Sequence, residues 1–336
     1  MKNREIQNQF EKVLQGDHLT LKEAEDLIES ILAGAEEYQV AATLALLRNK
    51  GETAEEIAGM AQAMLRHTVP VKTTSPVLDI VGTGGDHANT VNISTGAALV
   101  AAAAGVPVAK HGNRAVSSQC GSADVLEEMG ISLNQTPQEV IHSIETYGFG
   151  FMFAPSFHPA MKVIAPIRKK LKIRTIFNLL GPLLNPSQAQ FRLVGVYSPD
   201  LVEPIALAIQ KMGVKKAYVF HGSGLDELSP IGPSTGLLLD NSGLHPLTID
   251  PAALGIRACT IEELRGGCAK ENAHLLKESL FGKTGAITDA IALNAACGLY
   301  VYGKVDSMQE GVDLSMRIIH SGKAAALIKN MELQYA

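Results

Sequence analysis

Cysteine is scarce in this chain of 336 residues, and its spacing excludes two structural roles. The four cysteines, Cys120, Cys259, Cys268 and Cys297, form no C-x-x-C pair. Zinc sites and disulfide frameworks need regularly spaced cysteines, so neither is predicted. Scattered cysteines of this kind are typical of a reducing compartment, and we expect the protein in the cytoplasm.

Long apolar runs and basic clusters are also missing. A bilayer span needs roughly 18 or more apolar residues, and the alanine-rich part around Gly96 is too short and too glycine-flanked for one. The densest basic cluster is Lys169-Lys170 with Lys172, and the formal net charge is −5. Because binding to nucleic acid needs a block of positive charge, we expect neither a nucleic-acid partner nor a membrane partner. The polar residues 1–11 also argue against a signal peptide.

The residues that are present predict an α/β chain in two unequal parts. In the first part, Thr20-x-x-Glu23 and Thr53-x-x-Glu56 are capping boxes, each followed by apolar residues at helical spacing. Further along, short apolar strand patterns alternate with helical ones, which is typical of a sheet flanked by helices. We therefore predict a small helical domain at 1–72 and a larger α/β domain at 73–336, with a mostly parallel central sheet.

Two glycine-bearing loops follow the first two predicted strands. The strand at 77–81 runs into GTGGD (82–86), whose glycines let the backbone turn sharply and expose N–H groups to an anion. A helix at about 96–104 follows, with Ser94 or Thr95 as its predicted N-cap. The next strand, 106–109, runs into KHGNRAVSS (110–118). Ligands of parallel sheets bind where strands give way to helix N-termini, so the pattern predicts a polyphosphate site.

Other phosphate-binding motifs fail on spacing. A dinucleotide fingerprint needs a third glycine at position 87, where His87 stands. The Gly-Lys-Thr at 282–284 lacks the earlier glycine of a P-loop, because Lys277 occupies that place. A lone GTGG is also compatible with a simple tight turn. The pairing of two such loops about 25 residues apart favours the phosphate site.

Six motifs taken together resemble the anthranilate phosphoribosyltransferases. They occur in order over the whole chain: GTGGD, NISTG, KHGNRAVSSQCGSADVLEEMG, HPAMK, RTIFNLLGPLLNP and HGSGLDELS. The resemblance implies transfer of the phosphoribosyl group of 5-phosphoribosyl 1-diphosphate to the anthranilate amine, in tryptophan biosynthesis. It also implies two Mg²⁺ ions per subunit, a helical domain completed by about 163–185, and a homodimer formed through that domain.

The implied reaction needs no covalent nucleophile. Positive charge develops on the ribose and negative charge on the departing diphosphate, so the protein must supply N–H groups, cations and Mg²⁺. No G-x-S-x-G or similar nucleophile motif is present. We therefore predict no catalytic residue in the covalent sense, and the sequence leaves the proton acceptor for the amine open.

The site residues divide into three groups. The metal ligands implied by the resemblance are Ser94, Asp226 and Glu227. The anthranilate-binding residues implied are Gly82, Asn113 and Arg168, the last as a guanidinium for the carboxylate. The predicted donor-binding residues are Gly82, Gly85, Asp86, Thr90, Asn92, Ile93, Ser94, Thr95, Lys110, His111, Gly112, Asn113, Arg114, Ala115, Val116, Ser117, Ser118 and Ser122.

Several of these residues also have structural interpretations. Asp86 is compatible with a turn residue that bonds its own backbone, and Arg114 with an ion-pair partner of its loop. Without the resemblance, Asp226-Glu227 would be interpreted as a solvated acidic pair. His111 and His158 are candidate acids or bases, but a histidine in a glycine loop more often makes positioning hydrogen bonds.

Two rival functions share parts of the pattern. Pyrimidine nucleoside phosphorylases have a similar KHGNR loop, but they handle a single phosphate and have less need for the Asp226-Glu227 pair. A non-enzymatic paralogue that binds nucleic acid should show a basic face and degraded metal and acceptor sites. The acidic net charge and the presence of Asn113 and Arg168 favour the transferase.

Overall fold

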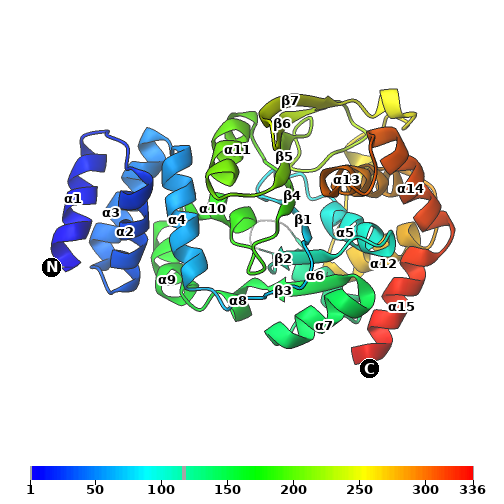
Figure 1. The fold of residues 1–336 in the computed structure, drawn as a ribbon, viewed down its shortest axis with the longest axis horizontal. Coiled ribbons are helices and arrows are strands. Elements are labelled where there is room, and N and C mark those ends of the chain that lie inside the picture. Colours follow the sequence, from blue (N-terminus) through cyan, green and yellow to red (C-terminus); the bar gives the residue numbers. More distant parts are fainter. Residues whose placement is uncertain (1, 116–118, 336) are drawn as a thin grey trace.

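The structure, a computed structural model, describes residues 2–115 and 119–335. Four helices open the chain and form a bundle at one end of the molecule, on the left in Figure 1. They are α1 (Lys2–Leu14), α2 (Leu21–Leu32), α3 (Glu37–Lys50) and α4 (Ala54–Arg66). Both predicted capping boxes are present, because the hydroxyls of Thr20 and Thr53 accept the N–H groups of Glu23 and Glu56 at 3.3 Å. The expected N-terminal helices are confirmed.

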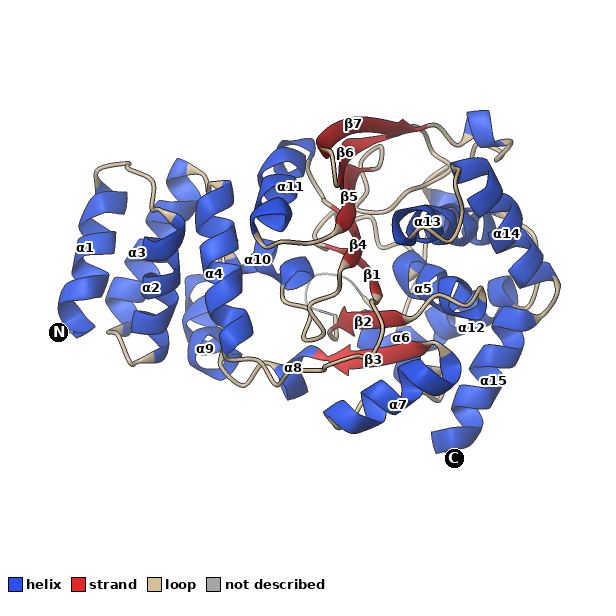
Figure 2. Ribbon diagram, in the orientation of Figure 1, coloured by secondary structure: helices blue, strands red, loops and turns tan. Residues whose placement is uncertain are grey.

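Seven strands form one sheet, with the order β3-β2-β1-β4-β5-β6-β7 (Figure 2). They are β1 (Leu78–Gly82), β2 (Val108–Gly112), β3 (Phe149–Phe153), β4 (Phe191–Gly195), β5 (Lys216–His221), β6 (Ser234–Asp240) and β7 (Gly243–Ile249). The strands β1 to β5 pair in parallel, whereas β6 and β7 form an antiparallel hairpin at one edge. This mostly parallel sheet confirms the predicted fold class.

Helices cover both faces of the sheet, because alternate strand residues are apolar on each face. Leu193 and Tyr218 point into one core, while Val194 and Val219 point into the core shared with the N-terminal bundle. The remaining helices are α5 (Ile93–Ala103), α6 (Ser122–Glu128), α7 (Pro137–Tyr147), α8 (Ala154–Phe157), α9 (Met161–Leu171), α10 (Phe177–Leu180), α11 (Val202–Lys211), α12 (Ala269–Leu280), α13 (Ala286–Tyr302), α14 (Met308–His320) and α15 (Lys323–Tyr335).

The chain returns to the N-terminal bundle after β3. Helix α9 packs against α2 and α3, and α10 packs against α4. On the other side of the sheet, α5 and α13 pack together in the core that contains Leu193 and Tyr218, at the right of Figure 1. In the two described stretches, no helix combines the length and apolar character that a bilayer crossing demands.

Three predicted element boundaries are wrong. Strand β2 extends to Gly112, because its pairing with β3 continues to that residue. Lys110 and His111 therefore lie in a strand rather than a loop. Helix α5 begins at Ile93 with Asn92 as N-cap, which places Ser94 and Thr95 inside its first turn. The sequence from His158 to about Asn178 predicts one helical stretch, but the helix is interrupted after α9, where Lys172 adopts a left-handed conformation (φ 53°).

Gly59 lies where α4 packs tightly against α2. A Cβ at this position would collide with the carbonyl oxygen of Leu21 and lie 2.9 Å from the Cβ of Ala24. We expect Gly59→Ala to lower the free energy of unfolding by about 1–3 kcal/mol in urea titrations, although alanine normally favours a helix. The matched control is Gly181→Ala, since no atom lies within 4 Å of a Cβ there, and it should stay within about 0.5 kcal/mol of the parent. A Gly59→Ala protein as stable as the parent would contradict this packing.

Candidate active site

The two predicted loops leave the same edge of the sheet. Strands β1 and β2 are parallel neighbours, so the loops that follow Gly82 and Gly112 start side by side. Strands β4 and β5 end at this edge as well, at Gly195 and His221. The carboxyl edge of a parallel sheet is the usual place for a ligand, and four segments meet there.

The pair Asp226 and Glu227 lies against the ends of β1 and β4. A side chain at Gly82 would collide with the Asp226 carboxylate, and one at Gly195 with the Asp226 backbone carbonyl. Glycine at both positions therefore permits the close approach of the 222–227 loop. The carboxylates accept N–H groups from the two opposing segments: Gly84 N–H donates to Asp226 Oδ2 at 2.5 Å, and Ser94 N–H donates to Glu227 Oε1 at 3.1 Å.

Both carboxyl groups hold their protons unusually tightly. Burial raises the pKa of Asp226 well above its usual value, and the neighbouring carboxylates of Glu227 and Asp86 raise it further. Burial likewise raises the pKa of Glu227 to about 7, while Lys110 opposes the shift. Buried oxygens with too little positive charge nearby are suited to a hard divalent cation such as Mg²⁺. The residues therefore fit the predicted metal.

Protein groups supply only part of such a coordination shell. In the part of the chain that the structure describes, no three or more histidine, cysteine, aspartate or glutamate residues form a metal-binding cluster. Mg²⁺ commonly binds through one or two carboxylates together with water and substrate phosphates. The arrangement at Asp226 and Glu227 is therefore typical of a metal that is held jointly with a phosphorylated substrate.

Lys110 supplies the fixed positive charge. Its side chain is buried, and Nζ donates to the carbonyl oxygen of Ile80 at 2.6 Å and to Ser94 Oγ at 3.4 Å. Burial lowers the pKa of Lys110, while Asp79, Glu227 and Asp226 oppose the shift. The ammonium therefore lies between the first strand, the start of α5 and the carboxylate pair.

Several residues in and after the GTGGD loop have positive φ. Gly84 and Gly85 have φ of 68° and 87°, and His87 and Asn89 have φ of 59° and 53°. Loops with left-handed residues can present N–H groups to an anion, although the N–H of Gly84 is already donated to Asp226. Asp86 Oδ1 accepts the N–H of Ala88 at 3.1 Å, which is the turn interaction considered as its alternative role.

The residues at the start of α5 face different surroundings. Ile93 and Thr95 are fully buried, and the Thr95 hydroxyl has no hydrogen-bond partner within the described ranges. Asn92 and Ser94 are half-buried, and Thr90 pairs with Arg265 in an isolated bridge. Of these predicted donor contacts, Asn92 and Ser94 have partly exposed side chains, but the Asn92 amide is already hydrogen-bonded to Asn272 and Cys120. Ile93 has only backbone atoms to offer.

The second loop is held by Asp124 at the start of α6. Asp124 Oδ2 accepts the N–H groups of Ala115 and Gly121 at 2.8 and 2.9 Å. The Arg114 guanidinium pairs with Asp124 at 3.0 Å and with Glu127 at 2.7 Å, so the structure places it in the ion pairs considered as its alternative. Asn113, directly after β2, is exposed, and its carbonyl oxygen accepts the Ser122 hydroxyl at 3.4 Å.

Three predicted donor residues, Val116, Ser117 and Ser118, lie outside the described residues. A side chain at Gly112 would collide with Ser122 Oγ, so the end of β2 and the start of α6 are in contact.

Arg168 carries a positive charge without an acidic partner among the described residues. It lies on α9, is half-buried, and within that part of the chain its guanidinium forms no ion pair. Its Cζ lies 5.8 Å from the centre of the Phe177 ring. Desolvation lowers the pKa of Arg168, which is the consequence of burying an unpaired cation. The structure shows no hydrogen bond between the described atoms of Arg168 and those of Gly82 or Asn113.

His111 and His158 form a buried pair. Their Nε2 atoms are 3.1 Å apart, and Nδ1 of His158 lies 3.1 Å from the Thr68 hydroxyl. Burial lowers the pKa of His111 to about 3 and that of His158 to about 4. Both imidazoles are therefore neutral near pH 7, and the hydrogen bond joins β2 to the start of the segment that leads to α9.

Two residues beside the loops were not found by sequence reasoning. Arg174 donates from Nη2 to the carbonyl oxygen of Gly85 at 2.7 Å, and its guanidinium stacks 4.3 Å from the Tyr197 ring centre. Asn272, on α12, donates to Asn92 Oδ1 at 2.9 Å. Both act across large separations in sequence, so periodicity carries no signal for them. The glycines 266–267 just before α12 were the available clue to the second contact.

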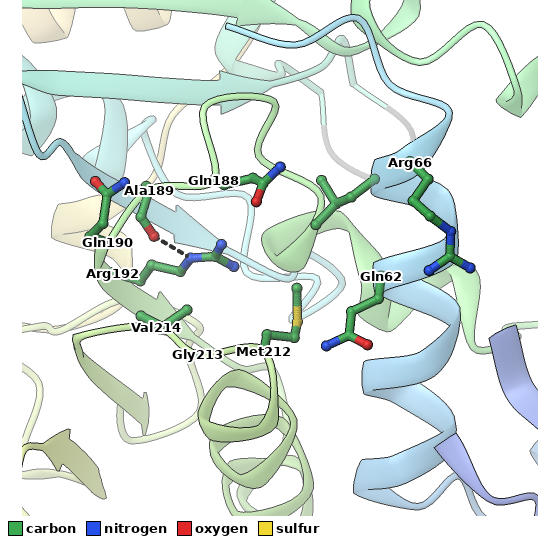
Figure 3. A pocket seen from close by; sticks show the side chains of 10 residues that line it. Gln62, Arg66, Gln188, Ala189, Gln190, Arg192, Met212, Gly213 and Val214 are labelled. Carbon is green, nitrogen blue, oxygen red and sulfur yellow. Dashed lines mark hydrogen bonds between the residues drawn. The ribbon is translucent and has the colours of Figure 1, made fainter. Parts of the chain in front are cut away.

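A cavity of about 500 Å³ lies away from this edge (Figure 3). It is lined by α4 and by residues 188–190 and 212–214, which precede β4 and β5. Its cations are already bound: Arg66 pairs with two carboxylates of α2, and Arg192 Nε donates to the Ala189 carbonyl oxygen at 3.0 Å. None of the predicted site residues that the structure describes lines it, so it is not the candidate active site.

Both parts of the chain match known protein families. Residues 8–68 match the glycosyl transferase family, helical bundle domain, and residues 74–325 match the glycosyl transferase family, a/b domain. Two curated relatives, both named anthranilate phosphoribosyltransferase, extend the match over nearly the full length. The protein from Chlamydia felis is 44% identical over 96% of this chain and 95% of its own. The protein from Moorella thermoacetica is 45% identical over 97% of both chains.

Solved structures give the same result. The anthranilate phosphoribosyltransferase of Thermus thermophilus superposes with a TM-score of 0.91 and 42% identity, over 97% of this chain and 98% of that one. The Saccharomyces cerevisiae enzyme in complex with PRPP and Mg has a TM-score of 0.89 and 32% identity, over 98% and 97%. Its complex with 4-fluoroanthranilate has a TM-score of 0.88, with the same identity and coverage. The chain therefore belongs to the anthranilate phosphoribosyltransferase family.

Proposed function

We propose that this protein transfers the phosphoribosyl group of 5-phosphoribosyl 1-diphosphate to the amine of anthranilate, releasing diphosphate, in tryptophan biosynthesis. The observation that carries the proposal is the position of Lys110 beside Asp226 and Glu227, at the edge where the GTGGD loop begins. This arrangement offers one fixed cation, a metal site and N–H groups to a diphosphate. The relative solved with PRPP and Mg supports the same assignment.

The donor is held by the two loops in this proposal. The N–H groups of the GTGGD loop and the hydroxyl of Ser94 contact phosphate oxygens, and Lys110 balances part of their charge. The segment from Lys110 to Ala115, with Ser122 behind it, borders the other side, and Val116, Ser117 and Ser118 remain predicted donor contacts. Because Lys110 and the GTGGD loop are held by hydrogen bonds to the protein, little reorganisation is needed as negative charge develops on the diphosphate.

Two Mg²⁺ ions per subunit complete the donor site in the proposal. Asp226 and Glu227 hold one ion, and Ser94 contacts the other beside the diphosphate. When bound, Mg²⁺ offsets charge on the leaving diphosphate. The two carboxylates otherwise lie in a site whose burial favours their protonated forms, so a cation is needed to keep both ionised.

Anthranilate needs a guanidinium for its carboxylate and an apolar surface for its ring. Arg168 meets the first need, since its charge is not satisfied by an acidic residue of the described chain, and Gly82 and Asn113 border the amine. His111 and His158 are too weakly basic near pH 7 to act as efficient general bases. We assign them a positioning role.

We further propose that residues 1–72, completed by about 163–185, form a helical domain that makes a homodimer, and that the enzyme works in the cytoplasm. Leu14, Tyr38 and Val163 support the dimer. They lie on α1, α3 and α9 with 58%, 70% and 45% of their surfaces exposed, and α3 contacts both α1 and α9. Large exposed apolar side chains grouped on neighbouring elements are typical of interaction surfaces.

The activity itself is tested by the fluorescence of anthranilate. We expect the signal to fall when 5-phosphoribosyl 1-diphosphate is added with Mg²⁺, and to stay constant when either is left out. No loss of fluorescence, combined with phosphorolysis of uridine or thymidine, would instead support a pyrimidine nucleoside phosphorylase.

Replacing Arg168 tests the anthranilate site. We expect Arg168→Ala to raise KM for anthranilate by about 10-fold to 100-fold, the usual effect of losing a charged hydrogen bond, with KM for the donor nearly unchanged. The matched control is Lys169→Ala, which removes an exposed cation from the same helix and should behave like the parent. Equal effects on both substrates would refute the assignment.

Replacing the acidic pair tests the metal site. We expect Asp226→Asn with Glu227→Gln to raise the Mg²⁺ concentration for half-maximal activity by at least about tenfold, because two ionic ligands are removed. The exposed pair Glu262→Gln with Glu263→Gln is the control and should leave the Mg²⁺ titration unchanged. A parent-like titration in the Asp226/Glu227 variant would rule out these residues as ligands.

A further inference from the structure

The segment before α12 runs alongside residues 89–91, which connect the GTGGD loop to α5. Residues Leu264 to Gly266 pair with residues 89–91 in three places. Val91 N–H donates to the Leu264 carbonyl oxygen and Gly266 N–H to that of Asn89, both at 2.9 Å, and Thr90 forms an isolated bridge with Arg265. The pairing fixes the backbone immediately before the predicted donor contact Asn92.

The side chain of Asn272 continues this connection into the site. It is 1% exposed, and its Oδ1 accepts the N–H of Gly267 at 2.7 Å while its Nδ2 donates to Asn92 Oδ1 at 2.9 Å. Asn92 in turn donates from Nδ2 to the carbonyl oxygen of Cys120 at 3.1 Å. Two amides in series therefore link α12 to Asn92 at the start of α5, and then to Cys120, which follows the KHGNRAVSS segment.

The local sequence is adapted to this contact. A side chain at Gly266 would collide with Oδ1 of Asn272, and one at Gly267 would collide with the carboxylate of Glu271. Asn92 is the N-cap of α5, yet its side chain makes no hydrogen bond to that described helix. The Asn92 amide, which is a good capping group, is instead committed to Asn272 and Cys120.

We propose that Asn272 is a positioning residue for the donor site: by fixing Asn92, it holds the two loops in the relative placement that lets both bind one diphosphate. The proposal rests on the proposed function and extends it to a residue that contacts neither substrate. Buried amides with all partners in place are rigid, and removal of one partner leaves the others unpaired. The effect of losing Asn272 therefore falls on Asn92 and on the loop at Cys120.

The test separates positioning from stability. We expect Asn272→Ala to raise KM for 5-phosphoribosyl 1-diphosphate, and the Kd of Mg²⁺-diphosphate measured by calorimetry, by about five- to tenfold, the usual effect of one hydrogen bond. KM for anthranilate should stay within about twofold. Ser279→Ala, which alters another buried polar residue of α12, is the matched control and should leave both constants unchanged.

A double-mutant cycle tests whether Asn272 acts on the donor site through Asn92. If Asn272 acts through Asn92, then Asn272→Ala should have little further effect on KM for the donor in an Asn92→Ala background. Additive effects, or a lower melting temperature with unchanged diphosphate affinity, would overturn the proposal. Should the parent itself fail to bind Mg²⁺-diphosphate and show no transferase activity, the proposed function fails instead, so the two failures are distinguishable.

Discussion

The site depends on the burial of two carboxylates next to a single lysine. Asp226 and Glu227 reach this position because glycines at the ends of β1 and β4 leave room for their loop. Burial raises the pKa of both carboxyl groups, the neighbouring carboxylates add to the shift, and the single ammonium of Lys110 does not cancel it at Glu227. A divalent cation bound here would offset the charge of the two carboxylates and attract a polyphosphate, which is the basis of the proposed donor site.

The same edge is supported from behind by a second buried polar network. Oδ2 of Asp79 on β1 accepts a hydrogen bond from the Asn185 amide at 2.7 Å. Asp79 also lies opposite Arg192 on the neighbouring strand β4. Asn185 also donates to the carbonyl oxygen of Ala109, which precedes Lys110. These contacts join β1, β2 and β4 below the site, so the strand ends that carry Lys110 and the GTGGD loop are held at a fixed separation.

Much of the fold could be predicted from local patterns. The capping boxes at Thr20 and Thr53 start helices as expected, because they need only residues three positions apart. The alternating pattern from Thr235 to Ile249 around Asn241-Ser242-Gly243 likewise predicts a hairpin, and β6 and β7 confirm it. The predicted start of α5 and the predicted end of β2 are wrong. The backbone conformation at Asn92 decides the first and pairing with β3 decides the second, and both depend on tertiary structure.

The site was predictable in its outline but not in its connections. Two glycine loops after neighbouring parallel strands are visible in the sequence, and the resemblance added Asp226, Glu227 and Arg168. Arg174 and Asn272 were not predicted, because each contacts Gly85 or Asn92 from a segment far away in the chain. The network around the donor loops is therefore the part that only a three-dimensional structure supplies.

A crystal structure with 5-phosphoribosyl 1-diphosphate and Mg²⁺ is the most direct test of the charge balance at this edge. We predict diphosphate density between the GTGGD loop and Lys110, with a metal ion coordinated by Asp226 and Glu227. Diphosphate bound elsewhere, for example in the cavity beside Arg192, with no metal at the two carboxylates, would contradict this prediction.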